Sequence, residues 1–137
     1  MPSHQATLQF RTRPHGFSNI TREVEKTVAA SGIQAGLCTV FVQHTSASLV
    51  IQENADPAVL RDLEAWMSDI VSEARSWEHD AEGRDDMPAH VRSALTKTSE
   101  SIPVQGGRLV LGTWQALYLW EHRAAPHTRT VVVHVQG

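Results

Sequence analysis

Residues 79–90, HDAEGRDDMPAH, crowd two histidines, four carboxylates and one arginine into a short segment with few apolar side chains. Such a segment contributes little to a hydrophobic core. It is therefore either a solvated loop or a place where charged side chains converge on a ligand. Histidine is also abundant in the whole chain, with eight residues among 137, so the chemistry of imidazole is the first to consider.

Three of the histidines have neighbours that suggest a ligand site. His44 follows an apolar run and precedes two hydroxyl residues in QHTSAS, His79 opens the acidic segment, and His90 lies near the start of a predicted helix. A strand end, a loop and a helix start can bring three imidazoles together around one divalent metal, with an open position for water or substrate. Imidazoles favour Zn²⁺ or another transition metal, and the nearby carboxylates also allow Mg²⁺. The alternative is that these histidines are solvated or buried in the core.

Carboxylates in the same motifs can bind a hard cation, orient a histidine ligand or move a proton. They are Glu53, Asp56, Asp80, Asp85 and Asp86. Together with His44, Asp86 and Glu53 are the candidate catalytic residues. Asp86 lies four residues before His90, so the two can meet on one helical face. Asp56 and Asp86 also have a local alternative, because both occupy plausible N-cap positions, whereas Glu53 has none.

An anionic group of a substrate has candidate partners in Arg84 and in the hydroxyls of Thr45 and Ser46. Arg84 lies just before the predicted third helix, where free backbone N–H groups also attract anions. Solvation is the alternative for a single arginine in a polar loop. Cys38, the only cysteine, lies in the apolar run LCTVF and is expected to be a buried, inert thiol. Trp114 in GTWQ is expected to pack at a pocket or a subunit interface.

The periodicity of apolar residues predicts the elements that position these groups. One helix is capped by Ser18 or Asn19 and ended by Gly32, and a second begins with Asp56 as its cap and Pro57 in its first turn. A short third helix begins near Met87. Strands are predicted at 6–13, 37–44, 47–53, 108–112, 113–122 and 128–136. Because strands and helices alternate in blocks, the chain is expected to be an α+β protein with a largely antiparallel β-sandwich and two or three helices.

Length and composition indicate one domain over residues 1–137, with 41% hydrophobic and 20% charged residues. The formal net charge is −3, and the sequence has no run or cluster of basic residues. Nucleic acid is therefore not expected as a partner. No segment approaches the ~20 apolar residues of a membrane helix, and a single cysteine suits a reducing compartment. We therefore expect a cytoplasmic protein without a membrane partner.

Three long motifs, taken together, are similar to those of a known family. HTSASLVIQENADP, WEHDAEGRDDMPAH and LGTWQALYLWEHR, in that order and spacing, resemble the YjbQ-type family of secondary thiamine-phosphate synthases. The likeness covers nearly the whole chain. It implies a small α+β fold with a β-sandwich, a homotrimer, and a polar site near His44, His79 and His90. Trp77 stands where Tyr is common in the family, and Arg123 stands where many members have Asp.

The activity that the resemblance implies joins hydroxymethylpyrimidine diphosphate to thiazole phosphate and releases pyrophosphate. A cation and basic groups would stabilise the charge of the departing diphosphate. Two other functions remain open. One is a metal-dependent hydrolase of a small ester or phosphoester, with Asp86 or Glu53 as base. The other is a non-catalytic trimer that binds a small anionic metabolite between subunits.

Overall fold

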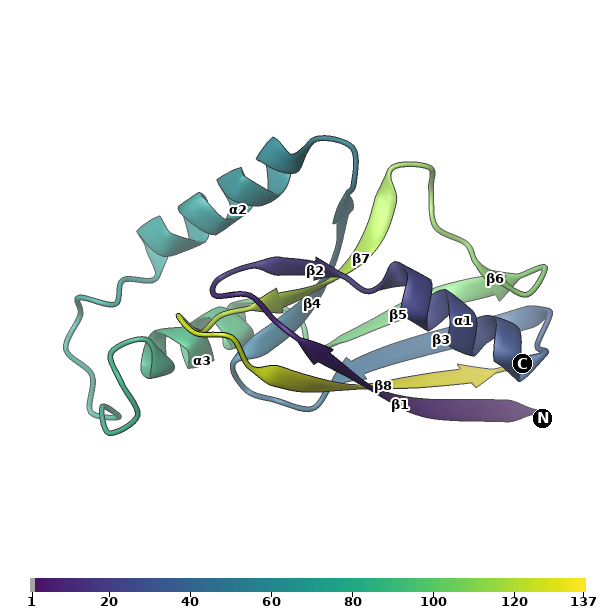
Figure 1. The fold of residues 1–137 in the computed structure, drawn as a ribbon, viewed down its shortest axis with the longest axis horizontal. Helices are drawn as coiled ribbons and strands as arrows, with labels where there is room; N and C mark the ends of the chain where they lie inside the picture. Colours follow the sequence, from purple (N-terminus) through teal and green to yellow (C-terminus); the bar gives the residue numbers. More distant parts are fainter. Residues whose placement is uncertain (1) are drawn as a thin grey trace.

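Two antiparallel sheets and three helices make up the described part of the chain, residues 2–137, in this computed structural model (Figure 1). One sheet has five strands in the order β1-β8-β3-β5-β6, and the other has three in the order β2-β7-β4. The strands are β1 Ser3–Arg11, β2 Phe17–Asn19, β3 Ala35–Val42, β4 Ala47–Glu53, β5 Ser99–Gln105, β6 Arg108–Leu109, β7 Gln115–Glu121 and β8 Thr128–Gln136. The helices are α1 Thr21–Ser31, α2 Pro57–Ile70 and α3 Asp86–Leu95. The α+β class and the antiparallel sheets expected from the sequence are confirmed.

The three-stranded sheet lies between two hydrophobic clusters. One cluster joins it to α1 and to the inner face of the five-stranded sheet, where Val131, Val133 and Val135 alternate with outward residues of β8. The other cluster covers its opposite face and includes Phe17, Trp120 and side chains of α2. Strand β7 is therefore buried on both faces from Ala116 to Glu121.

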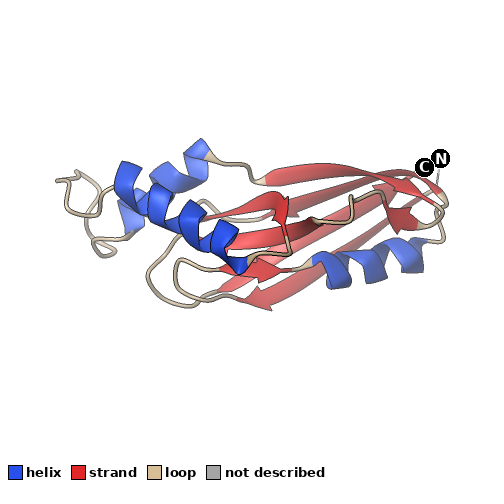
Figure 2. Ribbon diagram, turned by 90° about the horizontal axis from the view of Figure 1, so that it is seen from above, coloured by secondary structure: helices blue, strands red, loops and turns tan. Residues whose placement is uncertain are grey.

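Figures 1 and 2 show α2, α3 and the loop that connects them at one end of the molecule, with both termini at the other end. Helix α2 begins as its sequence predicts. The Asp56 carboxylate accepts the N–H of Ala58 at 2.9 Å, and Pro57 follows in the first turn. The Glu53 carboxylate accepts the N–H of Asp56 at 3.2 Å. Glu53 thus has a local role at the entrance to α2, which the sequence had not indicated.

Helix α1 also follows the prediction, with Gly32 in the left-handed conformation (φ 69°) at its C-cap. Its N-terminus differs in detail, because Ile20 occupies the N-cap position while Asn19 accepts the N–H of Thr21 at 3.1 Å. Cys38 is buried, and burial raises the pKa of its thiol to about 11, as expected for an inert core residue. No helix within residues 2–137 has the length and apolar character needed to cross a membrane.

Sequence periodicity missed two strands and overestimated the length of a third, which was predicted over 108–112. Strand β2 lies in a segment with no predicted strand, and so does β5, although its residues alternate between exposed and buried. Strand β6 has only two residues. The run VVVHV at 131–135 has few polar residues, a pattern that predicts a strand covered on both faces. In the chain its outer residues Val132 and His134 are half-exposed, so one face stays accessible.

Candidate metal centre

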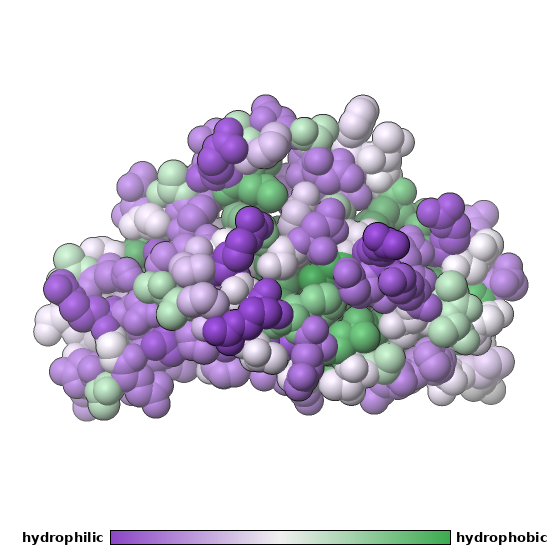
Figure 3. Space-filling view, viewed as in Figure 1, coloured by the Kyte–Doolittle hydropathy of each residue, from purple (hydrophilic) through white to green (hydrophobic). Residues whose placement is uncertain are grey.

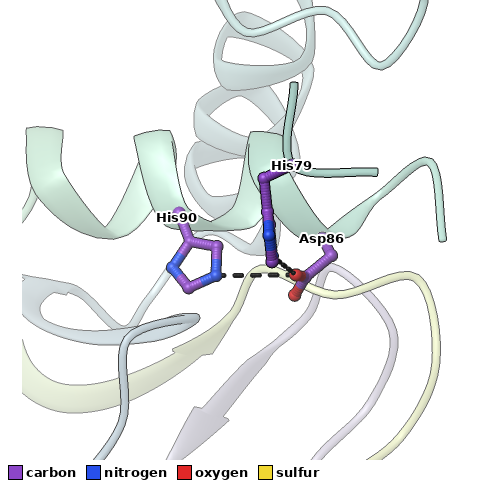
Figure 4. A group of neighbouring side chains, drawn as sticks. All are labelled: His79, Asp86 and His90. Carbon is purple, nitrogen blue, oxygen red and sulfur yellow. Dashed lines mark hydrogen bonds and ion pairs between the residues drawn. The ribbon is translucent and has the colours of Figure 1, made fainter. Parts of the chain in front are cut away.

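His79, Asp86 and His90 come together between α3 and the loop that precedes it (Figure 4). Each offers one ligand atom, and these atoms all lie within 4.8 Å of one another. His79 Nε2 lies 2.7 Å from Asp86 Oδ2, and His90 Nε2 lies 3.5 Å from the same oxygen. The Asp86 side chain is only 4% exposed, while those of His79 and His90 are 47% and 33% exposed. A buried carboxylate thus lies beneath two accessible imidazoles.

Helix geometry explains how two of these residues meet. Asp86 and His90 are separated by about one turn of α3, so both side chains project from the same face. His79 reaches them from the loop. The first residue of α3 is Asp86 itself, and its carboxylate bonds to His79 and to Arg123. The N-cap position belongs to Asp85, which makes no side-chain cap bond, so capping explains neither aspartate.

Arg123 fixes both aspartates from the end of β7. Its Nη1 lies 3.0 Å from Asp86 Oδ1, and its Nε donates to Asp85 Oδ2 at 2.8 Å. Asp85 Oδ2 also accepts the N–H of Ala124 at 2.8 Å, and Arg123 Nη2 donates to the carbonyl of Glu82 at 3.0 Å. The guanidinium therefore holds the acidic loop to the sheet and turns Oδ2 of Asp86 toward the imidazoles.

These contacts keep both carboxylates ionised. Burial acts to raise the pKa of Asp86, but the hydrogen bond from His79 and the charge of Arg123 outweigh it, so the pKa lies below its ordinary value. Burial likewise opposes ionisation of Asp85, and bonds from Arg123 and from the N–H of Ala124 lower its pKa overall. An ionised oxygen facing two imidazole nitrogens is a donor set suited to a cation.

His44 lies outside this group of three. It is exposed just beyond β3, and its Nδ1 accepts the N–H of Ser46 at 3.2 Å and lies 2.9 Å from Ser46 Oγ. A neutral ring in this arrangement carries its proton on Nε2. Partial burial and the charge of Arg129 lower the pKa of His44, so at neutral pH it is a neutral imidazole. Asp86 thus occupies the place that the sequence analysis gave to His44 in the ligand group.

A buried ion pair supports His44 from below. Arg129 Nη2 donates to Ser46 Oγ at 2.8 Å, and Arg129 Nε donates to Glu121 Oε1 at 2.8 Å. Glu121 has no exposed surface and also accepts the hydroxyl of Thr12 at 2.6 Å. Burial acts to raise the pKa of Glu121, yet the bonds from Arg129 and Thr12 lower it overall. Ser46, proposed from sequence as an anion ligand, is buried and orients His44 instead.

The remaining candidate residues lie apart from the cluster. Glu53 pairs with Gln115 at one end of β4, whereas Ala47 at the other end pairs with Glu121, next to the site. Thr45 is exposed between β3 and β4. Trp114 is 65% exposed, so no pocket within residues 2–137 encloses it, and the subunit interface expected for it stays a prediction.

Arg84 lies beside the cluster in a cavity of about 180 Å³, which is also lined by Arg75, Trp77 and His79. A larger cavity of about 500 Å³ lies on the other side of His79 and Trp77, where Met87 forms part of the wall. The guanidinium of Arg75 lies 4.4 Å from the centre of the Trp77 ring. The loop before α3 therefore offers two cations and an aromatic wall next to His79.

Sequence reasoning missed the roles of Arg123, Arg129 and Glu121. Arg129 carried a usable signal, because it shares its face of β8 with Val131, Val133 and Val135 in an alternating strand and must therefore point inward. Glu121 similarly ends an apolar strand, where a buried charge requires a partner. No pattern in the sequence paired Arg123 with the acidic loop, 38 positions away.

Comparisons with known proteins agree on one family. Residues 6–137 match the family model described as UPF0047 protein YjbQ-like. The Synechocystis UPF0047 protein sll1880 is 56% identical over 135 residues, covering 98% of this chain and 92% of the relative. The Salmonella typhimurium UPF0047 protein YjbQ is 40% identical over 135 residues, which cover 98% of this chain and 98% of the relative. A solved structure of an uncharacterized conserved protein of the same family, from Clostridium acetobutylicum, has a TM-score of 0.88 at 34% identity, over 96% of this chain and 99% of that one.

Proposed function

The chain belongs to the YjbQ-like UPF0047 family, and from this premise we propose that it is a metal-dependent enzyme acting on a small phosphorylated substrate. The single observation that carries the proposal is the approach of three donor atoms, from His79, Asp86 and His90, to within 4.8 Å of one another. Two imidazole nitrogens and one carboxylate oxygen are a ligand set typical of Zn²⁺ and other transition metals, and they suit Mg²⁺ less well.

The surroundings of the cluster support a catalytic use of the cation. Two of the three side chains are accessible to solvent, which leaves room for substrate, as catalytic metal sites require. Arg123 holds the second oxygen of Asp86, and such outer contacts fix the orientation of a ligand. When bound, the cation would supply positive charge to polarise a phosphate oxygen or to lower the pKa of a water molecule.

Arg84 and Arg75 are the residues that we propose for binding the phosphate groups. Both line the cavity that His79 borders, and guanidinium groups match phosphate oxygens with paired hydrogen bonds. Trp77 would form the wall for an aromatic ring of the substrate. With His44 nearby as a neutral imidazole, the chain has a group that can accept or return a proton.

The reaction that we propose is the one implied by the likeness to secondary thiamine-phosphate synthases. The thiazole nitrogen forms a bond with the methylene carbon of hydroxymethylpyrimidine diphosphate, the bond from that carbon to oxygen breaks, and pyrophosphate leaves with the electron pair. Arg75 and Arg84 would stabilise the negative charge that develops on the diphosphate oxygens. This activity is consistent with a site that combines an aromatic wall and cationic side chains.

Elemental analysis of the purified protein tests the metal site. We expect about one transition metal per chain in the wild type and strongly reduced content in His90→Ala. His134→Ala is the matched control, because His134 lies on the outer face of β8 and bonds to Gln5. Equal metal content in the wild type and His90→Ala would refute the site. Reduced content in His134→Ala as well would indicate a nonspecific effect of removing histidine.

Product analysis separates the proposed transferase from a hydrolase. The metal-loaded protein is mixed with hydroxymethylpyrimidine diphosphate, with or without thiazole phosphate. Thiamine phosphate and pyrophosphate appearing together, only when both substrates are present, would support the transferase. Release of phosphate or pyrophosphate without thiamine phosphate would favour the metal-dependent hydrolase instead. Stoichiometric substrate binding without turnover would favour the non-catalytic binding protein.

A homotrimer is part of the same proposal. Several large apolar side chains are exposed on the single chain, among them Phe41 at 44%, Trp66 at 56% and Trp114 at 65%. Large exposed apolar groups of this kind are typical of protein interfaces. Light scattering at micromolar concentration should give the mass of three chains. A monomer mass under these conditions would contradict the assembly, and it would leave the metal proposal to be decided by its own test.

A further inference from the structure

A third cavity lies away from the histidine cluster, between α2 and the turn that joins β1 to β2. Its volume is about 600 Å³, which falls within the ~300–1,000 Å³ typical of small-molecule sites. In Figure 3, apolar atoms are visible beneath α2, framed by polar side chains. We call this cavity the α2 groove and define it by Phe17, Leu60, Arg13, Arg61, Glu64 and Ala65.

The apolar part of the α2 groove is rigid. Phe17 is buried, stacks on Trp120 with ring centres 4.5 Å apart, and meets Tyr118 edge-on at 6.0 Å. Leu60 packs against the same cluster from α2. An aromatic ring held on two sides provides a fixed surface, so little conformational entropy is lost when an apolar ligand binds to it.

The polar part of the α2 groove is tied to a buried arginine behind it. Arg92 of α3 is 2% exposed and donates from Nη1 to Glu64 Oε2 and to His15 Nδ1, both at 3.1 Å. Glu64 also accepts the indole N–H of Trp120 at 3.0 Å. His15 adopts a φ of 48° to reach this position, which is uncommon for a residue other than glycine. A network drawn from several elements meets at this groove.

The charge of the α2 groove favours an anion. Glu64 is the carboxylate among the residues that line it, and Arg92 compensates its charge. Arg13 and Arg61 then remain at the groove, and Arg13 is fixed by a bond from Nη2 to the carbonyl of Phe17 at 2.6 Å. Among residues 2–137, Arg92 Nε is buried without a hydrogen-bond acceptor, but the ion pair with Glu64 balances its charge, so the positive charge left at the groove is that of Arg13 and Arg61.

We infer that the α2 groove is a binding site for a small organic acid, distinct from the metal centre. The acid group binds between Arg13 and Arg61, and the apolar body of the ligand lies against Phe17 and Leu60. This assignment rests on the combination of fixed aromatic surface and uncompensated positive charge. It does not depend on whether the histidine cluster binds a metal.

Calorimetric titration with 2-naphthoate and with its neutral analogue 2-naphthamide tests the site. The expected result is saturable binding of one naphthoate per chain, with naphthamide at least tenfold weaker. Arg61→Gln should weaken naphthoate binding about tenfold and leave naphthamide unchanged. Arg22→Gln, which removes the same charge from the exposed face of α1, should behave as the wild type. Absence of saturable naphthoate binding would overturn the inference, as would equal affinity for the two compounds.

A second variant locates the binding. Ala65 is exposed on α2 and lines the α2 groove, so Ala65→Trp should fill it and abolish binding of both compounds while the thermal melt stays that of the wild type. Binding that survives in folded Ala65→Trp would place the ligand elsewhere and refute the assignment. If Ala65→Trp changes the mass measured by light scattering, a second copy of the chain occupies the groove, which also refutes it. Metal content should be unaffected in all these variants.

Discussion

Acidification should destabilise this protein through one buried histidine. His122 has no exposed surface, its Nε2 lies 2.8 Å from Ser48 Oγ, and its ring packs on Trp120 with centres 4.9 Å apart. Burial, and next the charge of Arg92, lower the pKa of His122 to about 3. The perturbation to apply is a change from pH 7 to pH 5, in the wild type and in His122→Gln, whose amide can keep the contact with Ser48.

The expected magnitude follows from the difference between the folded and unfolded pKa values of His122. An unfolded histidine has a pKa of about 6.5, whereas the folded value is about 3. Between these values the unfolded state binds the proton and the folded state does not, so the free energy of unfolding falls as the pH falls. Each pH unit below about 6.5 costs roughly 1.4 kcal/mol, which gives about 2 kcal/mol at pH 5.

Urea unfolding of both proteins at pH 7 and pH 5 measures this difference. The wild type should lose about 2 kcal/mol more than His122→Gln over the interval, because the other titrating groups are common to both proteins. His134→Gln, a change on the outer face of β8, should keep the pH dependence of the wild type. An equal loss in the wild type and His122→Gln would show that His122 accepts its proton in the folded state, and would refute the reasoning from burial.

Three further substitutions have defined outcomes. Asp86→Asn should lower metal affinity by about tenfold to a hundredfold in a metal titration, and it should also lower the midpoint of the thermal melt because the buried carboxylate loses its charge opposite Arg123; unchanged metal affinity would refute Asp86 as a ligand. Arg123→Gln loses the contacts to Asp85 and Asp86, so limited proteolysis should cut the segment 72–85 faster than in the wild type. An unchanged rate of cleavage would mean that other contacts hold this loop. Glu121→Gln leaves Arg129 buried without a counter-charge and should cost about 3–5 kcal/mol in chemical unfolding; a loss below about 1 kcal/mol would show that solvent compensates the arginine.

Local patterns in the sequence predicted those elements whose signals are local. Asp56 and Pro57 at the start of α2 and Gly32 at the end of α1 are boundary signals that act within a few residues, and the structure confirms them. Strand β2 gave no such signal, because its three residues become a strand only by pairing with β7, about a hundred positions further along. Short strands of this kind are defined by their partners, and local pattern cannot reveal them.

Part of the candidate site was also predictable from local sequence patterns, and part depends on long-range packing. Asp86 and His90 are four residues apart, so helix periodicity alone placed them together, and His79 followed from its place in the acidic segment. Their partner Arg123 comes from another part of the chain, and its contribution depends on how the sheets and the loop pack. In the sequence, His44 was as good a candidate metal ligand as His79 or His90. In the structure, the connection between β3 and β4 turns the His44 ring toward Ser46. Long-range packing decided between the candidates.

Helix α3 is held from two sides, and this affects how strongly its ligands can bind. Asp86 and His90 face the loop, while Arg92, more than half a turn beyond His90 at about 3.6 residues per turn, is bonded to Glu64 of α2. The orientation of α3 is thus fixed when the protein folds. The conformational entropy lost in ordering the helix is therefore lost on folding and not on ligand binding. A substitution at Glu64 would remove one of these contacts, so that Asp86 and His90 would be held less firmly when a cation binds. If the cluster binds the proposed cation, its affinity depends in part on Glu64, a carboxylate outside the three proposed ligands.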